Sequence, residues 1–238
     1  MKALMKIISI LAALLLMFSC LVAALNVIFN ETGWLEKEYR EKLPFVETYY
    51  GIPLDDAVRV LSRMMHYSIG RVPDLSVTIV EDGEEVQFFN ESELSHMRDV
   101  RKLAATVMWM GMISLILSAA ALILLAVFRR TDCLRTAAKA FLIALAVLLA
   151  AIIAFGIWMA IDFDSFWRAF HVVFLDLESS TFDPAVSRMI RICPGELFSD
   201  FIMRFAAYSA VFVGIFAAGS VFLIVKGKKK CQDTPKKR

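Results

Sequence analysis

Four long apolar stretches dominate the pattern of hydrophobic and polar positions, over residues 7–28, 103–128, 140–161 and 201–225. Each is long enough for a membrane-crossing helix, which needs about 20 residues to span about 30 Å of hydrocarbon. Lipid cannot pair with backbone N–H and C=O groups, so each span must be helical. The first stretch is longer than the apolar region of a typical signal peptide, and we expect it to remain uncleaved.

The polar segment between the first two spans predicts a small α+β domain. Residues 53–67 place apolar side chains at helical spacing. Asp82-Gly83 is a strong signal for a two-residue hairpin turn. Pairing across this turn sets Ile79 opposite Val86 and gives the hairpin one apolar face. Since a single hairpin is marginally stable, we expect it to lean on the 53–67 helix or on lipid headgroups.

A further helix is predicted to begin after Asn90. Asn90 is a favourable N-cap, and Glu93 stands where a capping box places its carboxylate. No Gly or Pro follows until Gly111, so this helix should continue unbroken into the second span. His96 and Asp99 are three residues apart and therefore lie on one face of it, above the hydrocarbon.

The segment between the third and fourth spans is rich in aromatic residues, which suits a helix lying in the membrane interface. His171 lies among Phe163, Phe166, Trp167, Phe170, Val173 and Phe174. Small residues predict helix contacts within the spans. They are Gly111, Ser114 and Ser118 in the second span and a stripe of Ala206, Ala210, Gly214 and Ala218 in the fourth.

Composition and charge add an orientation to this topology. Hydrophobic residues make up 59% of the 238, which is too many for a soluble domain of this length. The two termini and the 129–139 loop carry 13 Lys and Arg against two acids, whereas the other side is acidic. The positive-inside rule therefore predicts that both termini are cytoplasmic. The basic tail fits this role and contact with anionic lipid, and we expect no nucleic-acid binding.

The predicted division of the chain follows from these patterns. It comprises a first transmembrane helix at 1–28, an extracytoplasmic domain at 29–102, a second transmembrane helix at 103–128, a cytoplasmic loop at 129–139, a third transmembrane helix at 140–161, an extracytoplasmic interfacial loop at 162–200, a fourth transmembrane helix at 201–225 and a basic cytoplasmic tail at 226–238.

Common catalytic signatures are absent, but three histidines lie outside the spans: His66, His96 and His171. The four cysteines form no evident disulfide pair or metal-binding motif. His96 and His171 each stand near a membrane edge, where lipid esters lie. Two imidazoles there can run acyl transfer, one deprotonating the attacking group and one protonating the leaving alkoxide. Histidines at an interface can equally be wetted amphipathic side chains without a catalytic role.

Motifs around these histidines resemble those of the bacterial lipoprotein intramolecular transacylase family. His96-Met97-Arg98-Asp99-Val100 is similar to a His-Met-x-Asp-Val motif, and Phe170-His171-Val172-Val173-Phe174 to a Phe-His-x-x-Phe motif. Further similar positions occur in the same order, at Tyr49-Tyr50-Gly51-Ile52, Thr181-x-Asp183-Pro184, Pro194 and Phe198-x-Asp200. The resemblance covers nearly the whole chain.

The resemblance implies an enzyme of the plasma membrane of a bacterium, which acts on diacylated lipoproteins. It would move the sn-2 acyl chain of the S-diacylglyceryl cysteine to the α-amino group and so form a lyso-form lipoprotein. His96 and His171 would be the catalytic pair on the extracytoplasmic face, with no metal or cofactor. Asp99 is a candidate to fix a histidine tautomer or to stabilise an imidazolium. Which histidine is the base, the acyl-chain preference and the oligomeric state stay open.

Four other residues are candidates for substrate contact. Arg98 and Arg168 can bind a phosphate or carbonyl group of the substrate, or extend to lipid headgroups. Phe170 and Phe174 flank His171 in the sequence. The chain departs from the family pattern at Ser179-Ser180-Thr181-Phe182, where Asn-Asp-x-Trp is expected, and at Ser187, where an aspartate is expected. A lipid-ester hydrolase with the same histidine pair therefore remains an alternative, as does a four-span protein with a partner-binding domain.

Overall fold

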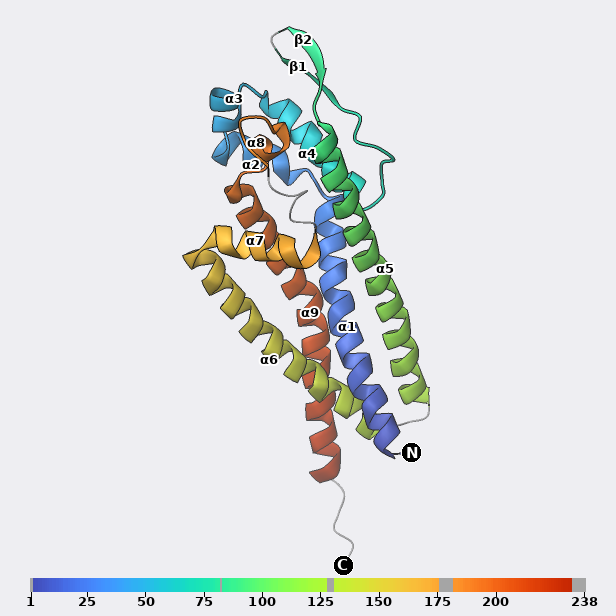
Figure 1. Ribbon diagram of the computed structural model, residues 1–238. Coiled ribbons are helices and arrows are strands. Elements are labelled where there is room, and N and C mark those ends of the chain that lie inside the picture. The colour runs from blue at the N-terminus through green and yellow to red at the C-terminus, as the bar shows by residue number, and fades with distance from the viewer. Residues whose placement is uncertain (1, 82, 128–130, 176–181, 233–238) are drawn as a thin grey trace, which may run out of the picture. The chain divides into compact units, whose positions relative to one another are not determined.

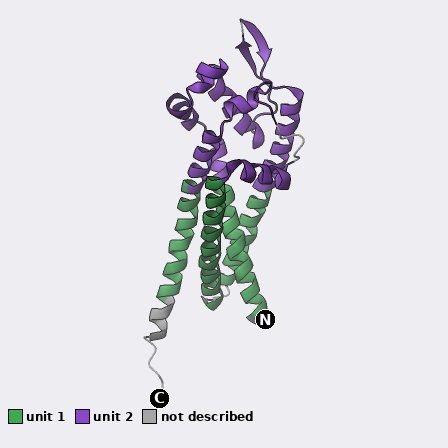
Figure 2. Cartoon of the chain, turned by 60° about the vertical axis from the view of Figure 1, so that its left-hand side comes forward, with its two compact units in different colours: residues 1–24, 109–161, 207–238 green, residues 25–108, 162–206 purple. Residues whose placement is uncertain are grey.

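The computed structural model describes residues 2–81, 83–127, 131–175 and 182–232 (Figure 1). Within these ranges the protein is mainly helical, with a small two-stranded antiparallel sheet. The chain divides into two compact units (Figure 2). Unit 1 contains residues 1–24, 109–161 and 207–238, and unit 2 contains residues 25–108 and 162–206.

Four helices of the described chain are long and apolar enough to cross a membrane, as predicted. They are α1 (Lys2–Asn30), α5 (Glu91–Val127), α6 (Thr131–Ile161) and α9 (Gly195–Gln232). Many apolar side chains of α5, α6 and α9 are not covered by the rest of the protein. Ile113, Ile153 and Phe222 are examples. Apolar side chains on the outside of a helix bundle are suited to lipid rather than water.

The long helices extend beyond the apolar stretches that predicted them. Helix α5 begins at Glu91 and continues unbroken into the second span, as its capping box and lack of early Gly or Pro indicated. Helix α6 begins at Thr131, so residues 131–139 of the expected loop are helical. Helix α9 begins at Gly195, directly after Pro194. Hydrocarbon thickness limits the apolar stretch of a helix but not its polar ends.

In unit 1, α1 packs closely against α5. A Cβ added to Gly111 would lie 2.4 Å from Cγ1 of Val22, so only glycine fits there. Ser118 Oγ is buried and donates a hydrogen bond of 2.8 Å to the carbonyl of Ala12. Together with the buried Ser114, these contacts confirm the predicted packing role of the small residues in the second span.

The predicted packing stripe of the fourth span is wrong. Ala206, Ala210, Gly214 and Ala218 are exposed on α9, and nothing lies within 4 Å of a Cβ placed on Gly214. Among the described side chains, the buried positions of this helix are Leu197, Val213 and Ser220 instead. Small residues allow a close approach between helices but do not impose one, so the stripe alone could not identify the packed face.

Unit 2 has a core of helices and one hairpin. The predicted amphipathic helix is α4 (Leu54–Ser68), which ends before Gly70. Two short helices precede it that the sequence patterns did not reveal, α2 (Trp34–Lys42) and α3 (Phe45–Tyr50). The core also receives α8 (Arg188–Ile192), again not predicted. Its largest fully buried side chains include Tyr39, Phe88, Leu35 and Ile192.

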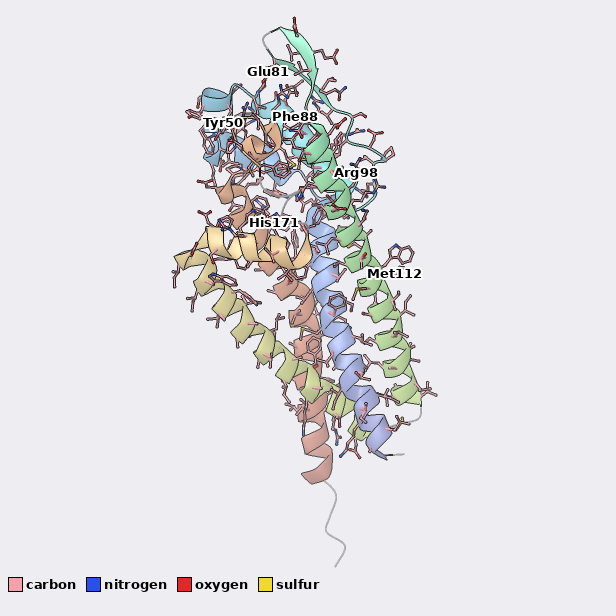
Figure 3. All side chains as sticks on the ribbon, in the orientation of Figure 1. Tyr50, Glu81, Phe88, Arg98, Met112 and His171 are labelled. Atoms are coloured by element: carbon pink, nitrogen blue, oxygen red, sulfur yellow. The ribbon has the colours of Figure 1, made fainter. Side chains whose placement is uncertain are left out.

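The hairpin has the register that the sequence predicted. Strands β1 (Thr78–Glu81) and β2 (Glu84–Gln87) pair antiparallel with Ile79 opposite Val86. Arg59 of α4 donates to the carbonyl of Thr78 at 2.8 Å, so the hairpin does lean on that helix. Glu81, labelled in Figure 3, forms an ion pair with Arg188 just C-terminal to the N-cap of α8.

Several sequence features lie outside the described residues. They are Asp82 of the predicted turn, Arg129 and Arg130 of the 129–139 loop, residues 179–181 of the first departure from the family pattern, and residues 233–238 of the basic tail.

Candidate active site

His96 lies on the second turn of α5, and the N-terminus of that helix is closely fixed. Asn90 Oδ1 accepts from the Glu93 N–H at 2.9 Å, and Glu93 Oε2 accepts from the Asn90 N–H at 2.8 Å. This reciprocal pair is the predicted capping box, which satisfies two of the otherwise unpaired N–H groups at the helix start. The helix that carries His96 therefore begins at a well-fixed N-cap, six residues before the histidine, and Glu93 of the same cap lies three residues before it.

His171 lies on α7 (Phe163–Phe174), the predicted aromatic helix (Figure 3). Asp162 caps this helix by accepting from the Ser165 N–H at 2.9 Å. The Nδ1 atom of His171 lies 2.8 Å from the carbonyl oxygen of Trp167. A carbonyl oxygen can only accept, so Nδ1 carries the proton and Nε2 of the neutral ring keeps its lone pair.

The fold brings the two motif histidines together within unit 2. Their ring centroids are 6.0 Å apart and their planes lie 24° from parallel. Both residues are buried, with exposed fractions of 7% for His96 and 6% for His171. The Phe182 ring packs edge-on against His96 at 5.3 Å, and the Trp167 ring against His171 at 4.6 Å. The pair therefore lies in an aromatic enclosure.

Electrostatics keep His96 neutral. Burial, and to a lesser extent the neighbouring His171, lowers the pKa of His96 from 6.5 to about 4, while Asp99 acts in the opposite direction. Desolvation disfavours the charged form of a histidine, and a second cation nearby does the same. At neutral pH His96 is thus an uncharged imidazole. Within the described part of the chain its Nδ1 atom is buried without a hydrogen-bond partner.

Asp99 does not hydrogen-bond to His96 in this arrangement. Its Oδ1 atom accepts from Lys102 at 2.8 Å instead. Residues three apart on a helix share a face, but a lysine one turn further along competes for the same carboxylate. Asp99 thus acts on His96 through its charge rather than by fixing a tautomer.

The four candidate substrate contacts occupy different surroundings. Phe170 packs against His171 at 5.6 Å, and the half-exposed Phe174 continues this aromatic row at 5.1 Å from Phe170. Arg168 lines a hollow of about 560 Å³ on α7, together with Asp162, Asp164 and Val172. Arg98 (Figure 3) is exposed and lines a separate hollow of about 230 Å³ beside Phe89 and Gln87.

Neither arginine contacts the histidine pair among the contacts of the described residues. Arg98 follows His96 by two positions, which is about 200° around a helix, so the two side chains leave α5 on different faces. The third histidine, His66, lies elsewhere, with Nε2 3.5 Å from the carbonyl of Asn30. Among the residues described, no three His, Cys, Asp or Glu side chains gather as metal ligands.

Two aromatic residues of the enclosure were not identified as site residues from the sequence. Trp167 precedes His171 by one helical turn, and this spacing placed both on one face. Phe182 was noted only as a departure from the family pattern. Its position over His96 depends on the path of the chain after α7, which no local periodicity encodes.

Comparison with known proteins agrees with this fold. The family model for "Lipoprotein intramolecular transacylase Lit" matches residues 10–198. The structure of membrane-integral Lit from Bacillus cereus is 14% identical, with a TM-score of 0.72 over 96% of this chain and 100% of that chain. A variant of it with a histidine-to-arginine substitution is 13% identical, with a TM-score of 0.71 over 96% of each chain. No curated protein matches the sequence.

The solved structures share this fold at low identity, and the family match rests on the sequence itself. It spans both histidine motifs and most of the chain, including the segment that carries Phe182. The protein therefore belongs to the Lit family of lipoprotein intramolecular transacylases.

Proposed function

We propose that this protein moves the sn-2 acyl chain of an S-diacylglyceryl cysteine to the α-amino group of the same lipoprotein. The observation that carries the proposal is the buried pair of imidazoles, His96 and His171, with ring centroids 6.0 Å apart. Two adjacent histidines also count against a purely partner-binding role, which gives no reason for burying them side by side.

The histidines take different roles in the proposed reaction. The bare Nε2 atom of His171 takes a proton from the attacking amine, since its Nδ1 is held by the Trp167 carbonyl. The amine nitrogen then bonds to the ester carbonyl carbon, and the bond from that carbon to the glyceryl oxygen breaks. The leaving oxygen takes back the proton from His171, so the catalyst is regenerated.

His96 serves as an electrophile in this scheme. A neutral imidazole offers one N–H, which can donate to the carbonyl oxygen as negative charge develops on it. The low pKa of His96 keeps the ring in that uncharged form over the whole neutral range. The aromatic enclosure limits water, which favours the amine over hydrolysis. Because both reacting groups belong to one molecule, proximity contributes a large part of the rate.

Mass spectrometry of a lipoprotein N-terminus tests the proposal. The reporter is produced in cells with the wild-type protein, with His96→Gln or with His171→Gln, and His66→Gln serves as a histidine control outside the site. We expect the N-acylated lyso form with wild type and His66→Gln only. Full conversion by either site variant would refute the catalytic pair. Release of a fatty acid without N-acylation would favour the hydrolase alternative.

We also propose that both termini are cytoplasmic and that the active site faces the outside. The Lys and Arg distribution supports this orientation. Reporter fusions that fluoresce only in the cytoplasm, placed at the C-terminus and within residues 83–84 of the hairpin, test it. Fluorescence from the hairpin fusion and none from the C-terminal fusion would invert the topology.

A further inference from the structure

The Glu93 carboxylate joins two parts of unit 2 that are far apart in sequence. It is 1% exposed. One oxygen, Oε2, closes the capping box with Asn90. The other, Oε1, accepts from Ser187 Oγ at 2.5 Å and from the Met189 N–H at 3.0 Å. Both oxygens of a buried carboxylate are thus used, as expected for a charge that is taken out of water.

Ser187 makes this connection specific. Its hydroxyl donates to Glu93 and accepts from the Ile190 N–H at 3.3 Å, so it also caps α8. Ser187 is one of the two departures from the family pattern, and its short hydroxyl side chain bonds to the buried carboxylate without placing a second negative charge beside it. The same segment begins with Phe182, whose ring packs against His96.

Glu93 and His96 are three residues apart on α5 and share a face. The carboxylate therefore fixes the 182–193 segment one turn away from the imidazole. We propose that Glu93 is a positioning residue, which holds this segment against α5 through Ser187 and Met189 so that Phe182 covers His96 and limits its access to water. Its effect on rate rests on the proposed function, whereas its effect on the burial of His96 does not.

The proposal differs from a simple helix-cap role for Glu93. A cap stabilises α5 through Asn90 alone and predicts no effect of Ser187 on His96. Positioning predicts that loss of the Glu93 contact and loss of the Ser187 contact expose the same ring. It also predicts that the two losses are not additive, because they break one shared connection.

Chemical modification of His96 tests this without reference to activity. The full-length protein in detergent is treated with diethyl pyrocarbonate, and carbethoxylation of His96 is followed by peptide mass spectrometry with His66 as internal reference. We expect roughly tenfold faster modification in Glu93→Gln and Ser187→Ala, since each loses a hydrogen bond to a charged group. Their double variant should be no faster than the faster single one. Glu91→Gln, an exposed acid in the same helical turn, should match wild type.

The pH profile of lipoprotein transfer gives a second readout. If water regains access to His96, the pKa of His96 should rise toward 6.5. The two charged or titratable groups that act on this ring, His171 on α7 and Asp99 on α5, stay in place in these variants. The acid limb of kcat/KM should then move to higher pH in Glu93→Gln and Ser187→Ala. A general loss of folded protein lowers the whole profile without moving that limb. Phe182→Ala should also move the acid limb to higher pH, although it keeps the contact between Glu93 and Ser187.

These outcomes separate the two proposals. Wild-type rates of His96 modification in folded Glu93→Gln and Ser187→Ala would overturn the positioning role. If Glu93→Gln fails to fold, Ser187→Ala and Phe182→Ala decide the question in the same assay. Faster modification together with no transfer by the wild-type protein would leave the positioning role standing and reject the transacylase function.

Discussion

At the scale of single residues, the surroundings of the two histidines give them different properties. His171 bonds through Nδ1 to the Trp167 carbonyl one turn earlier, which sets its tautomer. His96 has no hydrogen-bond partner for Nδ1 among the described residues, and Phe182 covers it. Two residues of one type therefore suit different steps, because one has a directional partner and the other is desolvated.

The low pKa of His96 predicts a pH-dependent stability. Between about pH 4 and pH 6.5 the unfolded chain protonates this residue, whereas the folded protein does not. Acid in this range therefore favours unfolding, and the contribution of His96 to stability rises with pH across it. We expect the Tm of wild type to fall more steeply than that of His96→Gln from pH 6.5 to pH 4. Thermal unfolding in detergent at several pH values measures this, and parallel slopes would contradict it.

At the scale of elements, local chemistry sets where each helix begins, and packing decides which faces meet. The capping box starts α5, and Asp162 starts α7. The contact of α1 with α5 instead depends on a missing side chain at Gly111. The exposed stripe of small residues on α9 shows that the same residue types need not form such a contact.

Gly111→Ala should disturb the packing of α1 against α5. The new Cβ would lie 2.4 Å from Val22 Cγ1, which is closer than atoms approach in real structures. Overpacking of this kind costs about 1–3 kcal/mol, so we expect a lower Tm in detergent. Gly214→Ala is the matched control, because nothing lies within 4 Å of its Cβ. Equal Tm values for both variants would show that α1 and α5 do not pack as described.

At the scale of the whole molecule, unit 2 is assembled from two segments, 25–108 and 162–206. Buried and partly buried contacts join these segments. Tyr39 OH donates to the carbonyl of Ile192 at 2.5 Å, and Phe29 packs edge-on against Phe201 at 5.6 Å. Each histidine of the site comes from a different segment. The site therefore exists only when both segments have folded together.

Tyr39→Phe tests this dependence. It removes one hydroxyl from a fully buried ring and leaves the Ile192 carbonyl without its donor. An unpaired buried acceptor costs about 1–3 kcal/mol, so the Tm should fall, and transfer activity should be lost at a lower temperature. Tyr49→Phe removes the same group from a ring that is 79% exposed and should leave both unchanged. A wild-type Tm for Tyr39→Phe would show that the contact does not hold the segments together.

The sequence by itself determined the features that depend on near neighbours along the chain. Apolar runs gave the four long helices, turn chemistry gave the register of Ile79 with Val86, and the Asn90 cap gave the start of α5. Motif order pointed to the family and to both histidines. These signals are local, since hydrogen bonding within a helix or hairpin involves residues only a few positions apart.

Only the tertiary structure decided what surrounds those features. The approach of His96 to His171, the cover of Phe182 and the bond of Glu93 to Ser187 join residues 75 to 94 positions apart. Such contacts are chosen by how whole surfaces pack, which periodicity and caps do not specify. The short helices α2, α3 and α8 were not predicted for the same reason. Their buried residues pack against residues from distant parts of the chain, and the local sequence does not identify those contacts.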